Sequence, residues 1–271
     1  MDIARLKATA KRMRENILTM LCEAKSGHPG GSLSCVEILA YLFIERMKRT
    51  KANSLSPDRD RFVLSKGHAA PALYAVFNEV GMLSEKELMT IRKLGSPLQG
   101  HPDVVKMPEV EASTGSLGQG LSIAQGMALA ARLDSSRRKV YCITGDGETQ
   151  EGQIWEALLS ASKFKLDNLI VFLDYNKSQI DGPVSEVMPL EPIKAKLEAF
   201  NWDVFEIDGH DFSQIADALA KCDNANGKPK YIIAHTVKGK CVSFMEGQIK
   251  WHGVAPTKEE TEKALNEIRN G

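Results

Sequence analysis

The fold is decided by residues 139–182, which read KVYCITGDGETQEGQIWEALLSASKFKLDNLIVFLDYNKSQIDG. Two apolar, β-rich segments, Val140–Thr144 and Leu169–Asp174, flank a helical pattern from about Gly152 to Lys163. A strand, a helix and a second strand in this order predict a βαβ unit with two neighbouring parallel strands. The carboxyl ends of such strands meet at one edge of the sheet, where open α/β sheets bind their ligands.

A polar tip follows each of the two strands. The tips are Gly145-Asp146-Gly147 and Asn176-Lys177-Ser178. The Asp146 carboxylate, the Asn176 side-chain oxygen and a nearby backbone carbonyl offer three hard oxygen ligands for Mg²⁺, and phosphate oxygens and water can complete an octahedron. The glycines would let the backbone approach a diphosphate closely. The alternative is an ordinary turn, because Asp and Asn beside Gly are common turn residues.

Strands and helices alternate along the rest of the chain. Three further segments have strand character: Arg61–Ser65, Asp203–Ile207 and Tyr231–His235. Apolar spacing predicts helices over residues 3–21, 36–47, 69–80, 85–94, 121–133, 152–163, 212–221 and 256–268. This alternation predicts an α/β fold with a mostly parallel sheet that helices flank on both faces.

Composition narrows the class of protein. The 271 residues carry a formal net charge of zero, with both signs mixed along the chain, which disfavours nucleic acid or a membrane surface as the main partner. No segment approaches the roughly 18–20 apolar residues of a membrane span. The five cysteines lack CxxC spacing, which suits a reducing compartment. We therefore expect a cytoplasmic globular protein.

Histidine and glycine occur together unusually often. Five of the six histidines, His28, His68, His101, His210 and His252, have a glycine neighbour, which places them on loops rather than on packed helix faces. A single histidine of this kind is usually a structural or surface group. His210 and His235 keep that structural interpretation.

The longer motifs resemble transketolases. GDGETQEGQIWEA and DYNKSQIDG carry the thiamine diphosphate signature, and four histidines lie in the further transketolase-like motifs SGHPGGSLS, LSKGHAAPALYA, QGHPD and KWHG. The resemblance covers essentially the whole chain but only the first third to half of a full transketolase. It implies that residues 1–271 form a diphosphate-binding (PP-type) domain of the thiamine-diphosphate-binding fold, with an N-terminal helical extension.

The resemblance also implies a set of site residues. Mg²⁺ is expected on Asp146, Asn176 and the backbone carbonyl of Ser178, and Ca²⁺ or Mn²⁺ can substitute for it. The residues expected to bind thiamine diphosphate are His68, Gly115, Ser116, Leu117, Gly145, Asp146, Gly147, Asn176, Ser178, Ile180 and His252. The residues expected to be catalytic are His28, His68, His101 and His252.

The four catalytic candidates have different expected roles. His28 and His252 are candidates for proton transfer and oxyanion contact, because imidazole can donate, accept or exchange a proton near neutral pH. His68 is expected near the cofactor, and His101 at the C1 hydroxyl of the sugar donor.

Three positions carry further expectations. Ser116 stands where the family usually has proline, which would change the stiffness of its loop. Cys241 stands where the family has glycine, which leaves the conformation of that loop open. Glu151 is expected to pair across a dimer interface.

By this resemblance the chain is the N-terminal subunit of a split transketolase. It would transfer a two-carbon ketol unit from a ketose (phosphate) to an aldose (phosphate), together with a C-terminal subunit that carries the pyrimidine-binding domain, in an assembly with two copies of each subunit. One alternative is a subunit of a deoxyxylulose-phosphate-synthase-like or 2-oxo-acid-dehydrogenase-like enzyme. Another is a non-catalytic scaffold with the same fold.

Overall fold

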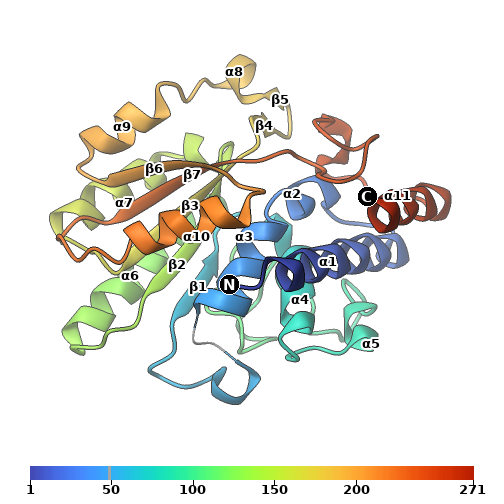
Figure 1. The fold of residues 1–271 in the computed structure, drawn as a ribbon, viewed down its shortest axis with the longest axis horizontal. Helices are drawn as coiled ribbons and strands as arrows, with labels where there is room; N and C mark the ends of the chain where they lie inside the picture. The colour runs from blue at the N-terminus through green and yellow to red at the C-terminus, as the bar shows by residue number, and fades with distance from the viewer. Residues whose placement is uncertain (48–49) are drawn as a thin grey trace.

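A parallel sheet of five strands forms the centre of the molecule (Figure 1). The computed structural model describes residues 1–47 and 50–271. The strand order is β1-β2-β3-β7-β6, and every neighbouring pair is parallel, which confirms the predicted α/β fold. The five strands are β1 (Arg61–Leu64), β2 (Val140–Gly145), β3 (Leu169–Tyr175), β6 (Asp203–Asp208) and β7 (Lys230–His235).

Helices cover the two faces of this sheet and extend beyond its β1 side (Figure 1). The longer helices are α1 (Ile3–Ala24), α3 (Val36–Tyr41), α4 (Ala70–Glu79), α6 (Gln119–Leu133), α7 (Gly152–Lys163), α9 (Ile193–Ala199), α10 (Phe212–Lys221) and α11 (Lys258–Asn270). Three shorter ones are α2 (Pro29–Leu33), α5 (Glu85–Leu88) and α8 (Val184–Val187). Within the described part of the chain, each helix is too short or too polar to cross a bilayer.

The strand residues alternate between two hydrophobic cores. In β2, Tyr141 and Ile143 belong to the core that contains α1, α3, α4 and α10, whereas Val140 and Cys142 belong to the core that contains α6 and α7. Successive side chains of a strand point to opposite faces, so this division follows from the pleat. Because both faces are covered, the strands read as continuous apolar runs rather than as alternating ones.

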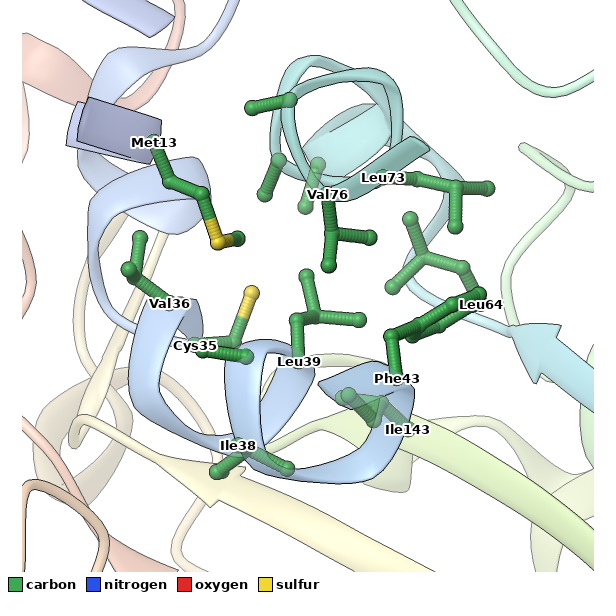
Figure 2. Packing of buried hydrophobic residues seen from close by; sticks show 14 of the residues in the cluster. Met13, Cys35, Val36, Ile38, Leu39, Phe43, Leu64, Leu73, Val76 and Ile143 are labelled. Carbon is green, nitrogen blue, oxygen red and sulfur yellow. The ribbon is translucent and has the colours of Figure 1, made fainter. Parts of the chain in front are cut away.

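The first core gathers α3 and α4 against the edge of the sheet. Figure 2 shows Leu39 and Phe43 facing Val76 and Leu73 of α4, with Leu64 of β1 beside Phe43. These side chains are buried, and burial of such an aliphatic or aromatic group contributes about 1.5–3 kcal/mol each. This packing anchors the loops that leave α2 and β1 toward the ligand-binding edge.

Several helices begin or end at other residues than the spacing of apolar residues predicted. The helix expected over residues 85–94 stops at Leu88, because the chain turns through Arg92, whose backbone φ is +59°, and the Arg92 N–H bonds to the Leu98 carbonyl. Ser84 and Glu87 form a capping box at the start of this helix. The last helix begins after Thr257, which caps it with Glu260, and not at Pro256.

Other differences concern helix type and elements that the sequence did not reveal. The segment expected as one helix over residues 36–47 is α3 followed by a π-helical turn over Leu42–Arg46. The glycine-rich stretch before it forms α2, with Pro29 at its first position. α8, α9 and a two-stranded hairpin, β4 (Ser178–Gln179) with β5 (Gly182–Pro183), were not predicted.

The start of α6 is packed unusually closely on the loop after β1. A Cβ atom at Gly120 would lie 2.5–2.6 Å from Ser65, whose Cα is one of the atoms it would meet. Gly126, one and a half turns later, has no neighbouring atom within 4 Å of its ideal Cβ position. The Gly- and Ala-rich α6 therefore packs closely on the rest of the described chain at Gly120 but not at Gly126.

We expect opposite effects from alanine at these two glycines. Gly120→Ala forces backbone apart and lowers the free energy of unfolding by about 1–3 kcal/mol. In Gly126→Ala the new methyl group meets open space. This substitution raises the free energy of unfolding by roughly 0.5–1 kcal/mol, since alanine favours the helix. Urea unfolding of the purified chain, followed by circular dichroism, measures both. Equal effects of the two substitutions would show that α6 does not contact the β1 loop in this way.

Candidate active site

A cavity of about 340 Å³ opens at the carboxyl edge of the sheet. β2, β3 and β7 end there, with Gly145 opposite Asp174 in the register and Asp174 opposite Ala234. The lining residues are Gly31, Lys66, His68, Leu117, Gly145, Asp146, Gly147, Glu148, Gln150, Glu151, Asn176, Ser178, Gln179, Ile180, Lys238 and His252. The two polar tips predicted from the βαβ unit thus meet in one pocket.

Oxygen atoms from the two tips converge on the N–H group of Ser178. This N–H lies 3.2 Å from Asp146 Oδ2 and 3.2 Å from Asn176 Oδ1. Gly147 lies close beside them, because a Cβ there would be 2.7 Å from the Cβ of Gln179 on β4. Within the described residues, no group of three or more His, Cys, Asp or Glu side chains is arranged to hold a metal. The ligands that this site can offer to a hard metal ion are therefore a carboxylate, an amide oxygen and a backbone carbonyl oxygen.

Asp146 is a buried carboxylate without a matching cation. Its side chain is only 2% exposed, and no lysine or arginine of the described residues forms an ion pair with it. Burial, reinforced by the nearby Asp174, raises the pKa of Asp146 to about 7. Such a group is poised to take a cation, since a bound divalent ion would compensate the buried charge.

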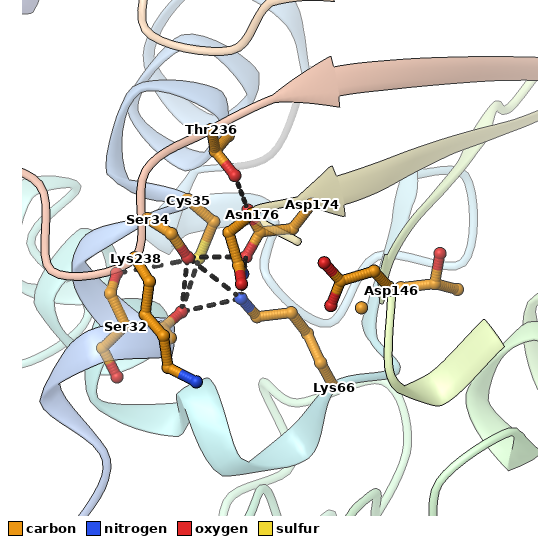
Figure 3. Close-up of polar contacts among 12 residues, drawn as sticks. Ser32, Ser34, Cys35, Lys66, Asp146, Asp174, Asn176, Thr236 and Lys238 are labelled. Carbon is orange, nitrogen blue, oxygen red and sulfur yellow. Dashed lines mark hydrogen bonds and ion pairs between the residues drawn. The ribbon is translucent and has the colours of Figure 1, made fainter. Parts of the chain in front are cut away.

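Asp174 has the opposite surroundings. It forms a buried ion pair with Lys66 and accepts hydrogen bonds from the hydroxyl groups of Ser34, at 2.6 Å, and Thr236 (Figure 3). Burial alone would raise the pKa of Asp174, but the lysine and these hydrogen bonds outweigh it and keep that pKa below its ordinary value. Figure 3 shows Asp146 on the other side of the Lys66 side chain.

Four histidines from separate loops form one cluster at the mouth of the cavity. The ring centroids of His68 and His252 are 5.1 Å apart in a stacked arrangement, and His28 lies 5.4 Å from His68 and 5.7 Å from His252. His101 lies 6.2 Å from His28. A Cβ at Gly31 would lie 2.9 Å from His68 Nε2, so a glycine is needed there.

The cluster is electrically neutral at pH 7. Burial, with the nearby Arg92, lowers the pKa of His28 to about 4, and burial, with Lys238, lowers the pKa of His252 to about 4. Burial also lowers the pKa values of His68 and His101. Neutral imidazoles can both donate and accept hydrogen bonds, which is the chemistry needed to hold the hydroxyl and carbonyl oxygens of a small polar molecule.

The structure brings some predicted residues into the cavity and leaves others outside it. His68, Leu117, Gly145, Gly147 and Ile180 line it, together with Asp146, Asn176, Ser178 and His252. Ser116 is exposed and does not line the cavity. Gly115, with φ +140°, lies under the His101 ring, where a Cβ would approach within 2.8 Å. His101 itself lines a second hollow with Asp103 and Ser113.

The two remaining histidines lie outside the cluster. His210 accepts a hydrogen bond from the Val237 N–H and lies 3.0 Å from Glu37. His235 lies 3.4 Å from Glu206 at the far edge of the sheet.

Three buried charged residues of the site were missed by the sequence reasoning: Lys66, Glu148 and Lys238. Glu148 accepts hydrogen bonds from the Ser65 hydroxyl and from the N–H groups of Gly118 and Gly145, so it joins the three loops around the cavity. Burial raises the pKa of Glu148. Lys66 and Glu148 stand next to motif residues, and that adjacency was the available signal. Lys238 stands on the loop of Cys241, which also resembles the family.

Comparisons with known proteins agree with this geometry. Residues 6–269 match the family described as transketolase, thiamine diphosphate binding domain. The chain is 41% identical to one of the subunits of apulose-4-phosphate transketolase from Phocaeicola vulgatus, over 99% of this chain and 95% of that protein. It is 44% identical to the 6-deoxy-6-sulfo-D-fructose transketolase subunit SqwG of Clostridium sp. strain MSTE9, over 97% of this chain and 96% of that protein.

Longer relatives match over part of their length. The chain is 42% identical to human transketolase, over 97% of this chain but 42% of that protein. The crystal structure of transketolase from Campylobacter jejuni superimposes with a TM-score of 0.94 at 36% identity, over 99% of this chain and 43% of that one. The chain therefore belongs to the transketolase family and corresponds to the part of it that binds thiamine diphosphate.

Proposed function

We propose that this chain is the N-terminal subunit of a two-subunit transketolase, which transfers a two-carbon ketol unit from a ketose (phosphate) to an aldose (phosphate). One observation carries the proposal. The chain covers at least 95% of relatives that are named as transketolase subunits, but only 42% of the human transketolase. In this proposal residues 1–271 act as one diphosphate-binding domain, α1 is its N-terminal helical extension, and the enzyme works in the cytoplasm.

The cavity fits thiamine diphosphate with a divalent cation. Mg²⁺ would be held by Asp146, Asn176 and the Ser178 carbonyl, because Asp146 is buried without a cation of its own. The rest of the cofactor would contact a larger set of residues: His68, Gly115, Ser116, Leu117, Gly145, Gly147, Ile180 and His252. When bound, the cofactor supplies an electron sink for cleavage of a carbon–carbon bond beside a carbonyl.

The chain's own residues would orient the sugar and handle its protons. The ring centroids of His28 and His252 lie 5.7 Å apart, and in this proposal the two rings would contact adjacent oxygens of a ketose. His68 stacks on His252 and holds its plane. His101, at the edge of the cluster, is placed for the terminal C1 hydroxyl of the donor.

The partner is the C-terminal transketolase subunit with the pyrimidine-binding domain. The cavity is open on one side, and the chain matches only 43% of a one-chain transketolase, so we expect the missing part to close the site. An assembly with two copies of each subunit would contain two shared sites.

The isolated chain should show no measurable ketol transfer. Adding a complementary C-terminal subunit should restore activity, with a dependence on subunit concentration that reports assembly, and thiamine diphosphate plus Mg²⁺ should tighten that assembly by linkage. A coupled ketose–aldose assay, run with a 2-oxo acid as the alternative donor, measures this. Full turnover by the isolated chain would refute the two-subunit proposal, and a preference for the 2-oxo acid would refute the donor class.

Asp146 should give the isolated chain a distinctive pH dependence. Since the pKa of Asp146 is raised to about 7 in the folded chain, the folded state binds more protons than the unfolded state between about pH 4 and pH 7. The stability contributed at this site is therefore lost as the pH rises through that window. From pH 5 to pH 8, wild type should lose on the order of 1–3 kcal/mol relative to Asp146→Ala.

Urea unfolding of both proteins at each pH measures this difference, and subtraction removes the opposite contribution of the histidines. Parallel pH profiles of the two proteins would contradict this prediction.

In the assembled enzyme, Asp146→Ala should weaken Mg²⁺-dependent binding of thiamine diphosphate by about tenfold or more, equivalent to about 1.4 kcal/mol or more.

His101→Ala should lower the specificity constant for ketoses with a C1 hydroxyl by roughly 10- to 100-fold, because a bound polar group loses one hydrogen bond. The affinity for thiamine diphosphate should stay nearly unchanged. His235→Ala is the matched control, since this histidine lies outside the cluster. Steady-state kinetics of the assembled enzyme measures the effect, and equal losses in cofactor affinity and in kcat/KM would indicate a structural role for His101.

A further inference from the structure

Lys238 is a buried lysine whose charge is not used in an ion pair. Its side chain is almost completely shielded from solvent, and among residues 1–47 and 50–271 no carboxylate forms an ion pair with it. The hydrogen bond found for its ammonium group joins Nζ to Nδ1 of His252 at 3.0 Å. A buried cation that faces an imidazole instead of a carboxylate needs a functional explanation, because unpaired buried charge is costly.

The chemistry of the two groups fixes the direction of this hydrogen bond. A lysine ammonium group has three donors and no acceptor. Nδ1 of His252 must therefore offer its lone pair, and in a neutral imidazole the proton then sits on Nε2. The low pKa of His252, caused by burial and then by Lys238, keeps the ring neutral. The ring of His252 also lines the cavity.

We propose that Lys238 is a positioning residue that locks His252 in the Nε2–H tautomer, so that His252 meets a sugar oxygen as a hydrogen-bond donor and not as a proton acceptor. The contact between His252 and a sugar oxygen rests on the proposed function, whereas the assignment of the tautomer does not. Of the two histidines proposed for proton transfer it leaves His28 as the proton acceptor, and the buried Nδ1 of His28 has no hydrogen-bond partner among the described residues.

The backbone around Lys238 is held at each successive residue. The Thr236 hydroxyl bonds to Asp174, the Val237 N–H bonds to His210, and the Gly239 N–H bonds to the Gly30 carbonyl. The Lys238 carbonyl accepts from the Gly247 N–H at 2.9 Å. These bonds fix the backbone on both sides of Lys238, so its side chain starts from a fixed position relative to His252.

The lysine stem and the imidazole ring are also held by packing. A Cβ at Gly30 would lie 2.9 Å from Cγ of Lys238, so the stem passes directly over α2. The His252 ring is stacked on His68 at an interplanar angle of 30° and lies edge-on to His28. Both partners of the Nζ–Nδ1 hydrogen bond are thus placed before any ligand binds, which is the requirement for a preorganised donor.

Nitrogen-15 spectra of the histidine side chains in the chain alone test the tautomer directly. In wild type, His252 should show an unprotonated Nδ1 and a protonated Nε2, and His252→Gln assigns its signals by their loss. In Lys238→Met, which keeps the length of the stem and removes the donors, the Nδ1 signal should move toward the average of the two tautomers. The pKa of His252 should also rise in this variant, because a nearby cation is gone.

Lys240→Met is the matched control, because Lys240 lies on the same loop, is partly exposed and faces Glu246 at 3.6 Å. It should leave the His252 spectrum unchanged, and Lys238→Arg should restore most of the wild-type pattern. Two outcomes would overturn the proposal: a protonated Nδ1 in wild type, or identical spectra for wild type and Lys238→Met. The first measurement uses wild type alone, so it decides the question even if a variant folds poorly.

Kinetics of the enzyme assembled with its partner then separates the two levels of inference. Lys238→Met should reduce kcat by about tenfold and Lys240→Met should not. If wild type has no transketolase activity while the spectra behave as expected, the proposed function fails and the tautomer assignment stands. If activity is present and the spectra show no effect of Lys238→Met, the tautomer assignment alone fails.

Discussion

A buried ion pair between Lys66 and Asp174 holds the ligand-binding edge of this molecule together. Removing two charges from water is costly, so such a pair persists only where further hydrogen bonds complete it. Here the Ser34 hydroxyl and the Thr236 hydroxyl donate to Asp174, and the Lys66 ammonium donates to the Gly31 carbonyl at 2.7 Å. These groups come from the segments after β1, at the end of β3, in α2 and after β7. The pair therefore fixes four loops relative to one another.

This arrangement separates the two acidic residues at the strand ends into different roles. Asp174 has its cation within the protein, and its pKa is lowered. Asp146 lies beside it and forms no ion pair within residues 1–47 and 50–271, and its pKa is raised. Two carboxylates with opposite shifts in neighbouring positions indicate a structural group and a ligand-binding group. If a cation binds here as proposed, the lysine that satisfies Asp174 also prevents that residue from competing for it.

The sequence predicted the sheet and the polar edge because both depend on local pattern. Apolar runs in β2 and β3 and the turn chemistry around Asp146 and Asn176 are visible in any window of residues. Helix ends were less predictable, since the turn at Arg92 depends on a bond to Leu98, which periodicity does not encode. The contacts of Lys66, Glu148 and Lys238 could not be read from the sequence, because each joins segments that only the folded chain brings together.

The buried lysines also determine what the histidines can do. In the chain alone, burial and nearby positive charge keep His28 and His252 neutral, with pKa values of about 4, so both are weak bases. An anion bound beside Lys238 would offset that charge and raise the pKa of His252 toward its ordinary value. His28 owes part of its low pKa to Arg92 and a smaller part to Lys238. Lys238 is the first-ranked cation for His252 but ranks below Arg92 for His28, so a single bound diphosphate would change their basicity unequally.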